Sequence, residues 1–318
     1  MDHSLMFSIV LRRLALSIPL LVIVSAITSL LESFVPGDPA RTVLGINATK
    51  EQYDALRAAL HLDKPFVEQY WLYLRDILHG DFGASLFSGE SVAGTIGERL
   101  PVTLTLVIGA TVVSALVGIL LGVYSATRGR FSRRLIDVVS LLGSALPNFW
   151  LALMLMSLFA VRFTIFPATG YTPFAESPGQ WANGLVLPVI ALSIGGVAMV
   201  SKVTRDAMLS TLALDHIRTL RACGVRPASI IWKHALRGCG LPVATAVGLS
   251  AIAFIPGSIL VENVFTLPGL GTTVVDATNQ HDLPVVQGAA ITFTLLVIAV
   301  NLLVDVVYSL LNPKVRVA

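Results

Sequence analysis

A short run of charged residues holds the side chains best placed to do chemistry in this sequence: Asp215, Arg218, Arg221 and Arg226. The chemistry that it indicates is ionic docking rather than catalysis. Residues three positions apart lie on one side of a helix, so Arg218 and Arg221 can face the same partner. The alternative is that these arginines only help to fix the orientation of the chain in a membrane. We interpret the run as a candidate docking surface.

A short helix has to position these charges, and the sequence marks both of its ends. Asp215 supplies an acidic group for the N-terminus, Gly224 a C-terminal stop, and Pro227 a barrier to continuation. A helix from Asp215 to Gly224 would be about 15 Å long, since each residue adds about 1.5 Å. The apolar residues expected to face away from the arginines are Leu214, Ile217 and Leu220.

The composition predicts a membrane protein. Hydrophobic residues make up 55% of the 318 positions and charged residues only 13%, whereas about a quarter of a soluble globular chain is charged. The basic residues lie at the ends and in the links of apolar runs. The net charge of +3 is therefore explained by membrane orientation, and we expect no binding of nucleic acid.

Six apolar stretches are each long enough to cross a bilayer core of about 30 Å. None of them contains Lys, Arg, Asp or Glu, and they cover residues 14–31, 100–127, 138–161, 177–201, 238–261 and 283–304. The expected fold is an all-α, multi-pass membrane protein. Its regions would be a tail and first span (1–31), an outer region (32–99), a core (100–311) and a C-terminal tail (312–318). We interpret the first stretch as a retained anchor, because it is longer than the core of a usual signal peptide.

The distribution of Lys and Arg predicts the side on which each link lies. Basic residues gather in the links after the second and fourth spans and in the C-terminal tail, whereas the links 163–176 and 262–282 contain no Lys or Arg. Because basic residues accumulate in short cytoplasmic links, both termini and the link 202–237 are expected in the cytoplasm.

The stretch 32–99 is the one sizeable region expected outside the membrane, on the extracytoplasmic side. Thr49 and Gln52 have the spacing of a capping box for a helix that runs through Leu60, and Pro65 can open a second helix. The residues that share an apolar face of the second helix are Val67, Trp71, Leu74 and Leu78. We expect two small amphipathic helices and a loop on the outer surface.

Small residues recur at every fourth position of the second span, at Ser114, Gly118, Gly122 and Ala126. Such a stripe lets another helix approach closely. We therefore expect helix packing there, and no chemistry.

Proline interrupts three of the spans, at Pro147 with Asn148, at Pro188, and at Pro256 with Gly257. Broken helices are tolerated where they are buried in protein or line a cavity, and they often mark a substrate route, although ordinary kinks are at least as common. A link from Glu262 to Gly271 is expected to form an outer loop near the path. The candidate pathway or gate residues are Pro147, Asn148, Phe149, Pro256, Glu262 and Asn263.

No motif for catalysis, nucleotide binding or metal binding is present. None of the five lysines follows a glycine, so the chain lacks a phosphate-binding loop for ATP. Gly-x-Ser-x-Gly and His-Glu-x-x-His motifs are also missing. The two cysteines, Cys223 and Cys239, have no second pair and are expected to be free thiols. We predict no catalytic residue, no cofactor and no metal site in this chain.

An ion-coupled carrier and a proton-gated channel are two functions that a polytopic membrane protein could have. Carriers of protons or sodium usually place carboxylates inside their spans. Here the acidic residues lie at span edges, where caps or water-facing charges are expected: Asp137, Asp206, Glu262, Asp282 and Asp305. That placement weakens both alternatives.

The stretch from Asp215 to Pro242 resembles the cytoplasmic "EAA" loop of bacterial ABC-importer permeases, specifically in the dipeptide/oligopeptide branch. It contains DHIRTLRACG and then KHALRGCGLP. Further blocks similar to that branch follow one another in the same order: GDFGASL (80–86), RLPVTLTL (99–106), SALPNFWLA (144–152) and ENVFTLPGLGTTVVDATNQHDLPVVQG (262–288). The resemblance therefore extends over nearly the whole chain.

This resemblance implies the type I ABC-importer permease fold and a transport function in the inner membrane of a bacterium. Two permease subunits would form the path, the second a related but different chain. Two cytoplasmic ATPases would bind ATP and Mg, and an extracytoplasmic binding protein would deliver di- or oligopeptides. Relatives in the branch also carry nickel complexes, glutathione or haem, so the cargo stays open.

The resemblance also assigns the stretch from Asp215 to Gly224 as the helix that couples to the ATPases. The ATPase-coupling residues that it implies are Asp215, Arg218, Thr219, Arg221, Ala222, Gly224 and Arg226. One departure is that Arg218, Thr219 and Leu220 stand where the strict motif has Glu-Ala-Ala. Asp215 is the candidate replacement for the missing glutamate.

Overall fold

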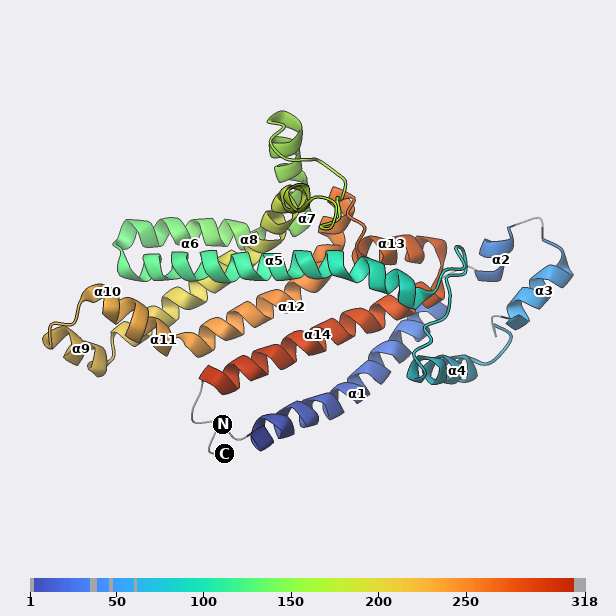
Figure 1. Ribbon diagram of the computed structural model, residues 1–318, viewed down its shortest axis with the longest axis horizontal. Coiled ribbons are helices and arrows are strands. Elements are labelled where there is room, and N and C mark those ends of the chain that lie inside the picture. Colours follow the sequence, from blue (N-terminus) through green and yellow to red (C-terminus); the bar gives the residue numbers. More distant parts are fainter. Residues whose placement is uncertain (1–2, 35–38, 46–47, 60–61, 312–318) are drawn as a thin grey trace. The chain divides into compact units, whose positions relative to one another are not determined.

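The computed structural model describes residues 3–34, 39–45, 48–59 and 62–311, and these residues are almost entirely helical (Figure 1). Within them the only β-type pairing is an isolated antiparallel bridge between Ala84 and Ser91. The prediction of an all-α chain is therefore confirmed. The chain divides into two compact units, one built around residues 103–267 and the other from residues within 11–102 and 268–298.

The unit around residues 103–267 is organised on one long helix, α8 (Pro178–Leu212). This helix packs against α12 (Gly240–Phe265), α6 (Arg130–Ala145) and α7 (Asn148–Leu155). Thirteen of its residues are buried, among them Leu192, Val200 and Met208. The smaller elements are η1 (Met156–Arg162), α9 (Asp215–Ala222), α10 (Pro227–Ser229), η2 (Ile230–Ala235) and α11 (Leu236–Gly238), of which η1 and η2 are π-helical.

The other unit contains most of the first helix and the short helices that follow it. Its elements are α1 (His3–Ser33), α2 (Pro39–Leu44), α3 (Lys50–Ala59), α4 (Phe66–Leu78) and α13 (Leu270–Gln280). The first turns of α5 (Val92–Thr127) and the first half of α14 (Leu283–Leu311) also belong to it. A buried cluster of Val92, Ala277 and Val285 joins α5, α13 and α14.

The two outer helices form as predicted, and α2 is an additional short helix. Thr49 and Gln52 make a reciprocal capping box: the Thr49 backbone N–H donates to Gln52 Oε1 at 3.0 Å, and the Gln52 N–H donates to Thr49 Oγ1 at 3.3 Å. The second span, however, begins at Val92 instead of Leu100. The last part of the predicted outer loop is therefore the first two turns of α5.

Four of the six predicted spans are single helices long and apolar enough to cross a membrane: 92–127, 178–212, 240–265 and 283–310. A shorter apolar stretch, Ala15–Leu31, lies within α1 and corresponds to the first predicted span. The third, 138–161, is not one straight helix: the pair Ile136–Gly143 and Asn148–Arg162 is bent by 102°.

The bend in the third span has its cause at Pro147. The residue before a proline is driven out of the helical region, and Leu146 is extended, with φ −88° and ψ 132°. Pro147 then precedes the first residue of α7. By contrast, α8 continues through Pro188 and α12 through Pro256. A broken helix is therefore wrong at these two prolines, while the other interpretation, an ordinary kink within a continuous helix, stays open. Packed neighbouring helices hold a membrane helix together across a missing N–H.

The small-residue stripe of α5 packs against α8, as predicted. Ser114 Oγ donates to the Ser193 carbonyl at 3.1 Å. A Cβ atom added at Gly118 would lie 2.7 Å from Val200 Cβ, and one added at Gly122 would lie 2.6 Å from Thr204 Cβ. The two backbones therefore approach so closely that only glycine fits at these positions.

Gly122→Ala is expected to lower the free energy of unfolding by about 1–3 kcal/mol, because overpacking forces neighbouring atoms apart. The added Cβ would also lie 2.7 Å from the Ser201 carbonyl oxygen, which belongs to the backbone and cannot swing away. Thermal unfolding of the purified chain in detergent measures the change. The matched control is Gly97→Ala on the same helix, whose Cβ would meet nothing within 4 Å. Equal stability of the two variants would contradict the packing.

Candidate coupling surface and translocation pathway

The helix α9 and the turn that follows it present all seven predicted coupling residues on an exposed surface. Asp215, Arg218, Thr219, Arg221, Ala222, Gly224 and Arg226 are each exposed. Asp215 and Arg218 form an ion pair of 3.2 Å with side chains that are 93% and 71% exposed. Pairs this exposed contribute little to stability, so both groups are available for contacts to another molecule. We name Asp215, Arg218, Thr219, Arg221, Ala222, Gly224 and Arg226 the coupling surface.

Gly224 ends α9 in the way that the sequence predicts. Its φ is +74°, a conformation that favours glycine. The Gly224 N–H donates to the Arg221 carbonyl, and the Val225 N–H donates to the Leu220 carbonyl, both at 3.1 Å. These two bonds form a Schellman motif, which fixes the direction in which the chain leaves the helix.

Apolar contacts hold α9 to the rest of its unit. Ile217 is completely buried and Leu220 is half-buried, whereas Leu214 precedes the helix and is half exposed. The helix packs against η2, where Ile230 is also buried. The predicted apolar face therefore exists at Ile217 and Leu220 but does not include Leu214.

The end of α8 and the start of α12, which flank the stretch that contains α9, meet in a tightly packed junction. Thr211 Oγ1 and Cys239 Sγ lie 3.4 Å apart, and the Cys239 thiol donates to the Ala235 carbonyl. A buried cluster surrounds them and consists of Val123, Ala126, Met208, Ala235, Cys239 and Val243. The C-terminal end of α8 and the N-terminal end of α12 are therefore joined to each other.

The two cysteines are free, as predicted, but differ in accessibility: Cys223 is exposed and Cys239 is buried. Cys239 precedes the apolar stretch that begins at Gly240. Burial raises the pKa of its thiol, and this effect is larger than the opposite effect of the hydrogen bond with Thr211, which lowers the pKa. A raised pKa leaves less thiolate, the reactive form, at neutral pH.

A maleimide is therefore expected to label Cys223 and to leave Cys239 unmodified in the folded chain. Mass spectrometry after labelling at neutral pH should find one adduct, and two after denaturation. Cys223→Ser should remove the adduct from the folded chain. Rapid labelling of Cys239 without denaturation would contradict the packing of α8 on α12.

An ionic contact between α8 and α6 lies near this junction and is not indicated by the sequence. Arg205 of α8 is only 12% exposed and pairs with Asp137 of α6 and with the neighbouring Asp206. The sequence indicated Arg205 only as one of the basic residues that set orientation. Its pairing depends on the contact between α6 and α8, which no local pattern reveals.

The predicted pathway residues at the broken span lie beside α12. A Cβ atom added at Gly257 would lie 3.0 Å from the side-chain nitrogen of Asn148, and α7 packs against α12. Phe149 is 42% exposed, and Pro147 and Pro256 are also exposed. The structure therefore brings the break at Pro147 and the Pro256–Gly257 pair into one neighbourhood.

Glu262 and Asn263 differ from their predicted setting. Both belong to α12, which continues to Phe265 and ends at Thr266 in the left-handed conformation, so no outer loop begins at Glu262. Glu262 is completely buried and accepts a hydrogen bond of 2.7 Å from Thr103 Oγ1. Asn263 is exposed and donates to the Ile259 carbonyl of its own helix. The prediction of a water-facing Glu262 is wrong.

Asp282 is a second predicted edge carboxylate that is buried instead. Its side chain accepts hydrogen bonds from Ser85 Oγ at 2.5 Å and from the Leu86 N–H at 3.1 Å. It therefore anchors the loop between α4 and α5 to the turn between α13 and α14. The partners are 197 and 196 positions apart, and no local pattern indicates this anchor.

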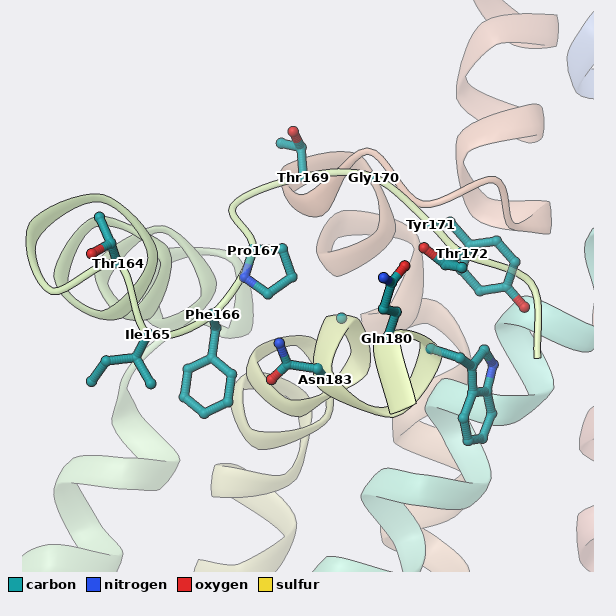
Figure 2. Close-up of a pocket in the computed structure, with 12 residues that line it drawn as sticks. Thr164, Ile165, Phe166, Pro167, Thr169, Gly170, Tyr171, Thr172, Gln180 and Asn183 are labelled. Carbon is teal, nitrogen blue, oxygen red and sulfur yellow. The ribbon is translucent and has the colours of Figure 1, made fainter. Parts of the chain in front are cut away.

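A cavity of about 570 Å³ lies between the link after η1 and the start of α8 (Figure 2). All twelve lining residues are uncharged. Figure 2 shows the Gln180 side chain rising from α8 toward the link at Gly170, with Asn183 on the same helix. The amide groups of Gln180 and Asn183 could hydrogen-bond a neutral polar group there.

The comparisons with known families agree on one assignment. Residues 118–317 match the family described as "binding-protein-dependent transport system inner membrane component", and residues 6–107 match its N-terminal membrane component. Together the two matches extend over almost the whole chain.

Individual relatives align with this chain from end to end. A putative peptide transport system permease protein of Brucella melitensis is 38% identical over 98% of this chain and 99% of its own length. A probable peptide ABC transporter permease protein of Sinorhizobium fredii is 35% identical over 96% and 98%. The glutathione transport system permease protein GsiC of Escherichia coli K12 is 36% identical over 98% and 99%.

Among solved structures, the inward-facing MetNI methionine ABC transporter aligns with a TM-score of 0.49 and 18% identity, over 68% of this chain and 95% of that chain. The family match and the full-length relatives make the assignment. The chain belongs to the family of binding-protein-dependent transport system inner membrane components, the multi-pass permease subunits of ABC importers.

Proposed function

We propose that this chain forms half of the translocation path of an ATP-driven importer of di- and oligopeptides and couples to cytoplasmic ATPases through α9. The observation that carries the cargo assignment is the 35–38% identity, over nearly the full chain, to permeases named for peptide transport. The coupling assignment is supported by the exposed coupling surface on a helix anchored at Ile217.

The proposed coupling runs from α9 into two spanning helices at once. The chain enters α9 from α8 and leaves it through η2 and α11 into α12. Since α9 packs on η2, and Cys239 contacts Thr211, a displacement of α9 would act on both α8 and α12. These two helices are packed together, and such packed elements tend to move as rigid bodies between discrete arrangements. Closure of the ATPases would in this way tilt the helices beside the path.

The proposed path runs beside the bend at Pro147. Asn148 and Phe149 would face it from α7, and Pro256 would face it from α12. The exposure of Phe149 and the contact between Asn148 and Gly257 support this proposal. Glu262 would act by holding α12 to α5 through Thr103 and would not contact cargo.

The remaining parts of the machine would be other chains. We expect two cytoplasmic ATP-binding subunits that hold ATP and Mg, an extracytoplasmic binding protein, and a second, related but different permease. Both termini and the coupling surface would lie in the cytoplasm, which the distribution of Lys and Arg supports. This chain would perform no catalysis itself, since no phosphate-binding loop is present in its sequence.

Glutathione, a tripeptide, is the second candidate cargo. It is supported by the 36% identity to the glutathione permease GsiC over nearly the full length of both chains. An importer of di- and oligopeptides and an importer of glutathione would share the path and the coupling surface and differ mainly in the binding protein.

The test is uptake of labelled dipeptides, oligopeptides, glutathione and nickel by cells with and without this chain, each repeated after ATP depletion. Loss of ATP-dependent peptide uptake alone would support the first proposal, and loss of glutathione uptake alone the second. Loss of nickel uptake alone would overturn both cargo proposals. Uptake that depends on this chain but persists without ATP or the ATPases would overturn the coupling proposal and favour an ion-coupled carrier.

A further inference from the structure

We propose that α4 is an in-plane membrane helix, which inserts one apolar face into the lipid at the end of the first span. The inference is independent of the cargo and of the coupling surface. It rests on three observations: the exposure of the apolar face of α4, the depth at which α4 is attached to α1, and the distribution of charge around α4.

The apolar face of α4 is exposed to an unusual degree. Val67, Trp71, Leu74 and Leu78 follow one another at intervals of four, three and four residues, so they share one side of the helix. Val67 is 76% exposed, Trp71 68% and Leu78 84%. A contiguous apolar face of this kind requires an apolar environment in the assembled protein.

The attachment of α4 lies within the apolar stretch of α1. The Tyr70 hydroxyl bonds the Val22 carbonyl at 2.9 Å and the Ser25 hydroxyl at 2.8 Å. Both partners belong to the stretch Ala15–Leu31, the first candidate span. Ser25 precedes Leu31 by six residues, which places the bond about 9 Å along the helix from the end of that stretch. Amphipathic helices of the membrane interface are buried to about 5–10 Å.

A second contact supports the inference that α4 is attached to α1 below the membrane boundary. Ser29 of α1 accepts a hydrogen bond of 3.1 Å from Gln287, which lies one turn into α14 from its start at Leu283. Ser29 is therefore near the same membrane boundary as the start of α14, and Ser25 lies one turn deeper. A helix attached at Ser25 cannot stand clear of the bilayer.

The charges of α4 leave the lipid-facing side free. Glu68 pairs with Lys64 at 2.8 Å, and Arg75 with Asp76 at 3.0 Å. Tyr70 contacts α1 and Phe66 stacks on Tyr70, and the exposed apolar face is next to this side of the helix. A helix with this arrangement lies with its charges toward water and its apolar face toward the acyl chains, and Trp71 suits the interface itself.

The test is spin-label accessibility in the assembled transporter in lipid nanodiscs. Cys223 and Cys239 are first replaced by serine, and a nitroxide is then attached singly at Val67→Cys, Trp71→Cys or Leu78→Cys. The matched control is Glu68→Cys on the charged side of the same helix. We expect nitroxides at the three apolar positions to collide more often with oxygen, which concentrates in lipid, than with a water-soluble nickel chelate. The ratio should invert at position 68.

Two outcomes would overturn the proposal. Preferential collision with the nickel chelate at all four positions would mean that the face is in water. An immobilised spectrum with few collisions from either reagent would mean that another protein covers it, either the second permease or the binding protein. Because all four label sites are exposed, the substitutions should leave the fold intact, and ATP hydrolysis by each labelled transporter verifies this.

Discussion

Reversing the charge of Arg221 is expected to reduce ATP-dependent uptake at least about tenfold while the chain remains inserted and folded. Arg221 is exposed in the last turn of α9, on the coupling surface. A partner site that accepts the guanidinium group would be negatively charged, so an acidic residue at position 221 would be repelled by it. Contacts between like charges cost several kcal/mol, and every increment of about 1.4 kcal/mol lowers the binding constant tenfold. Uptake by membrane vesicles and quantitative blotting of the chain measure the two effects separately.

The control for Arg221→Glu is Arg134→Glu, an equally exposed charge reversal on α6. It should leave uptake within about twofold of the wild type, as surface substitutions usually change free energies by less than about 0.5 kcal/mol. If both reversals reduced uptake equally, the loss would reflect general electrostatics or orientation in the membrane, and the coupling role of Arg221 would be wrong.

The backbone at Gly224 offers an independent test of the same surface. Proline fixes φ near −65°, whereas Gly224 has a φ of +74°. Gly224→Pro should therefore destroy the Schellman motif and redirect α9, with loss of uptake comparable to that of Arg221→Glu. Gly224→Ala should be milder, because alanine in the left-handed region costs about 1–2 kcal/mol. Normal uptake in Gly224→Pro would contradict the need for a fixed α9.

The second large effect is expected in the buried interior of the helix bundle, where Thr103→Val should lower the free energy of unfolding by about 1–3 kcal/mol. The substitution keeps the shape of the side chain but removes the donor to Glu262, a completely buried acceptor. Since α5 and α12 are joined by this bond, the loss should also loosen the α5–α12 contact. Denaturant unfolding in detergent measures the change.

Two further variants distinguish this bond from general packing. Thr103→Ser retains a hydroxyl and should recover most of the stability. Thr111→Val removes a hydroxyl that donates to the Val107 carbonyl of the same helix, α5. This variant should lower the free energy of unfolding less than Thr103→Val does. A similar loss in all three variants would show that the Thr103 hydroxyl has no special role.

The features predicted correctly from the sequence are those determined by a few neighbouring residues. The ends of α9 follow from Asp215 and Gly224, and the start of α3 follows from the Thr49 and Gln52 capping box. The close approach at Gly122 could also be predicted, because a stripe of small residues has one common use in membrane helices. In each case the pattern lies within one helix and acts locally.

The features that were missed depend on the partner of a residue in the folded chain. For Pro188 and Pro256 the sequence left a broken helix and an ordinary kink open, and packed neighbours hold α8 and α12 continuous. Glu262 and Asp282 lie at span edges in the sequence, yet each is buried by a partner more than 150 positions away. Composition and periodicity carry no information about such pairings.

In the mechanism that we propose, α9 transmits ATP hydrolysis to a peptide path formed by this chain. Its most direct test is accumulation of a labelled oligopeptide in proteoliposomes that contain the assembled transporter, with the binding protein on one side and ATP on the other. The wild type should accumulate peptide only with ATP, and the Arg221→Glu transporter should not accumulate it even though the complex assembles. Accumulation that needs no ATP, or that the substitution leaves unchanged, would show that α9 does not couple ATP hydrolysis to transport.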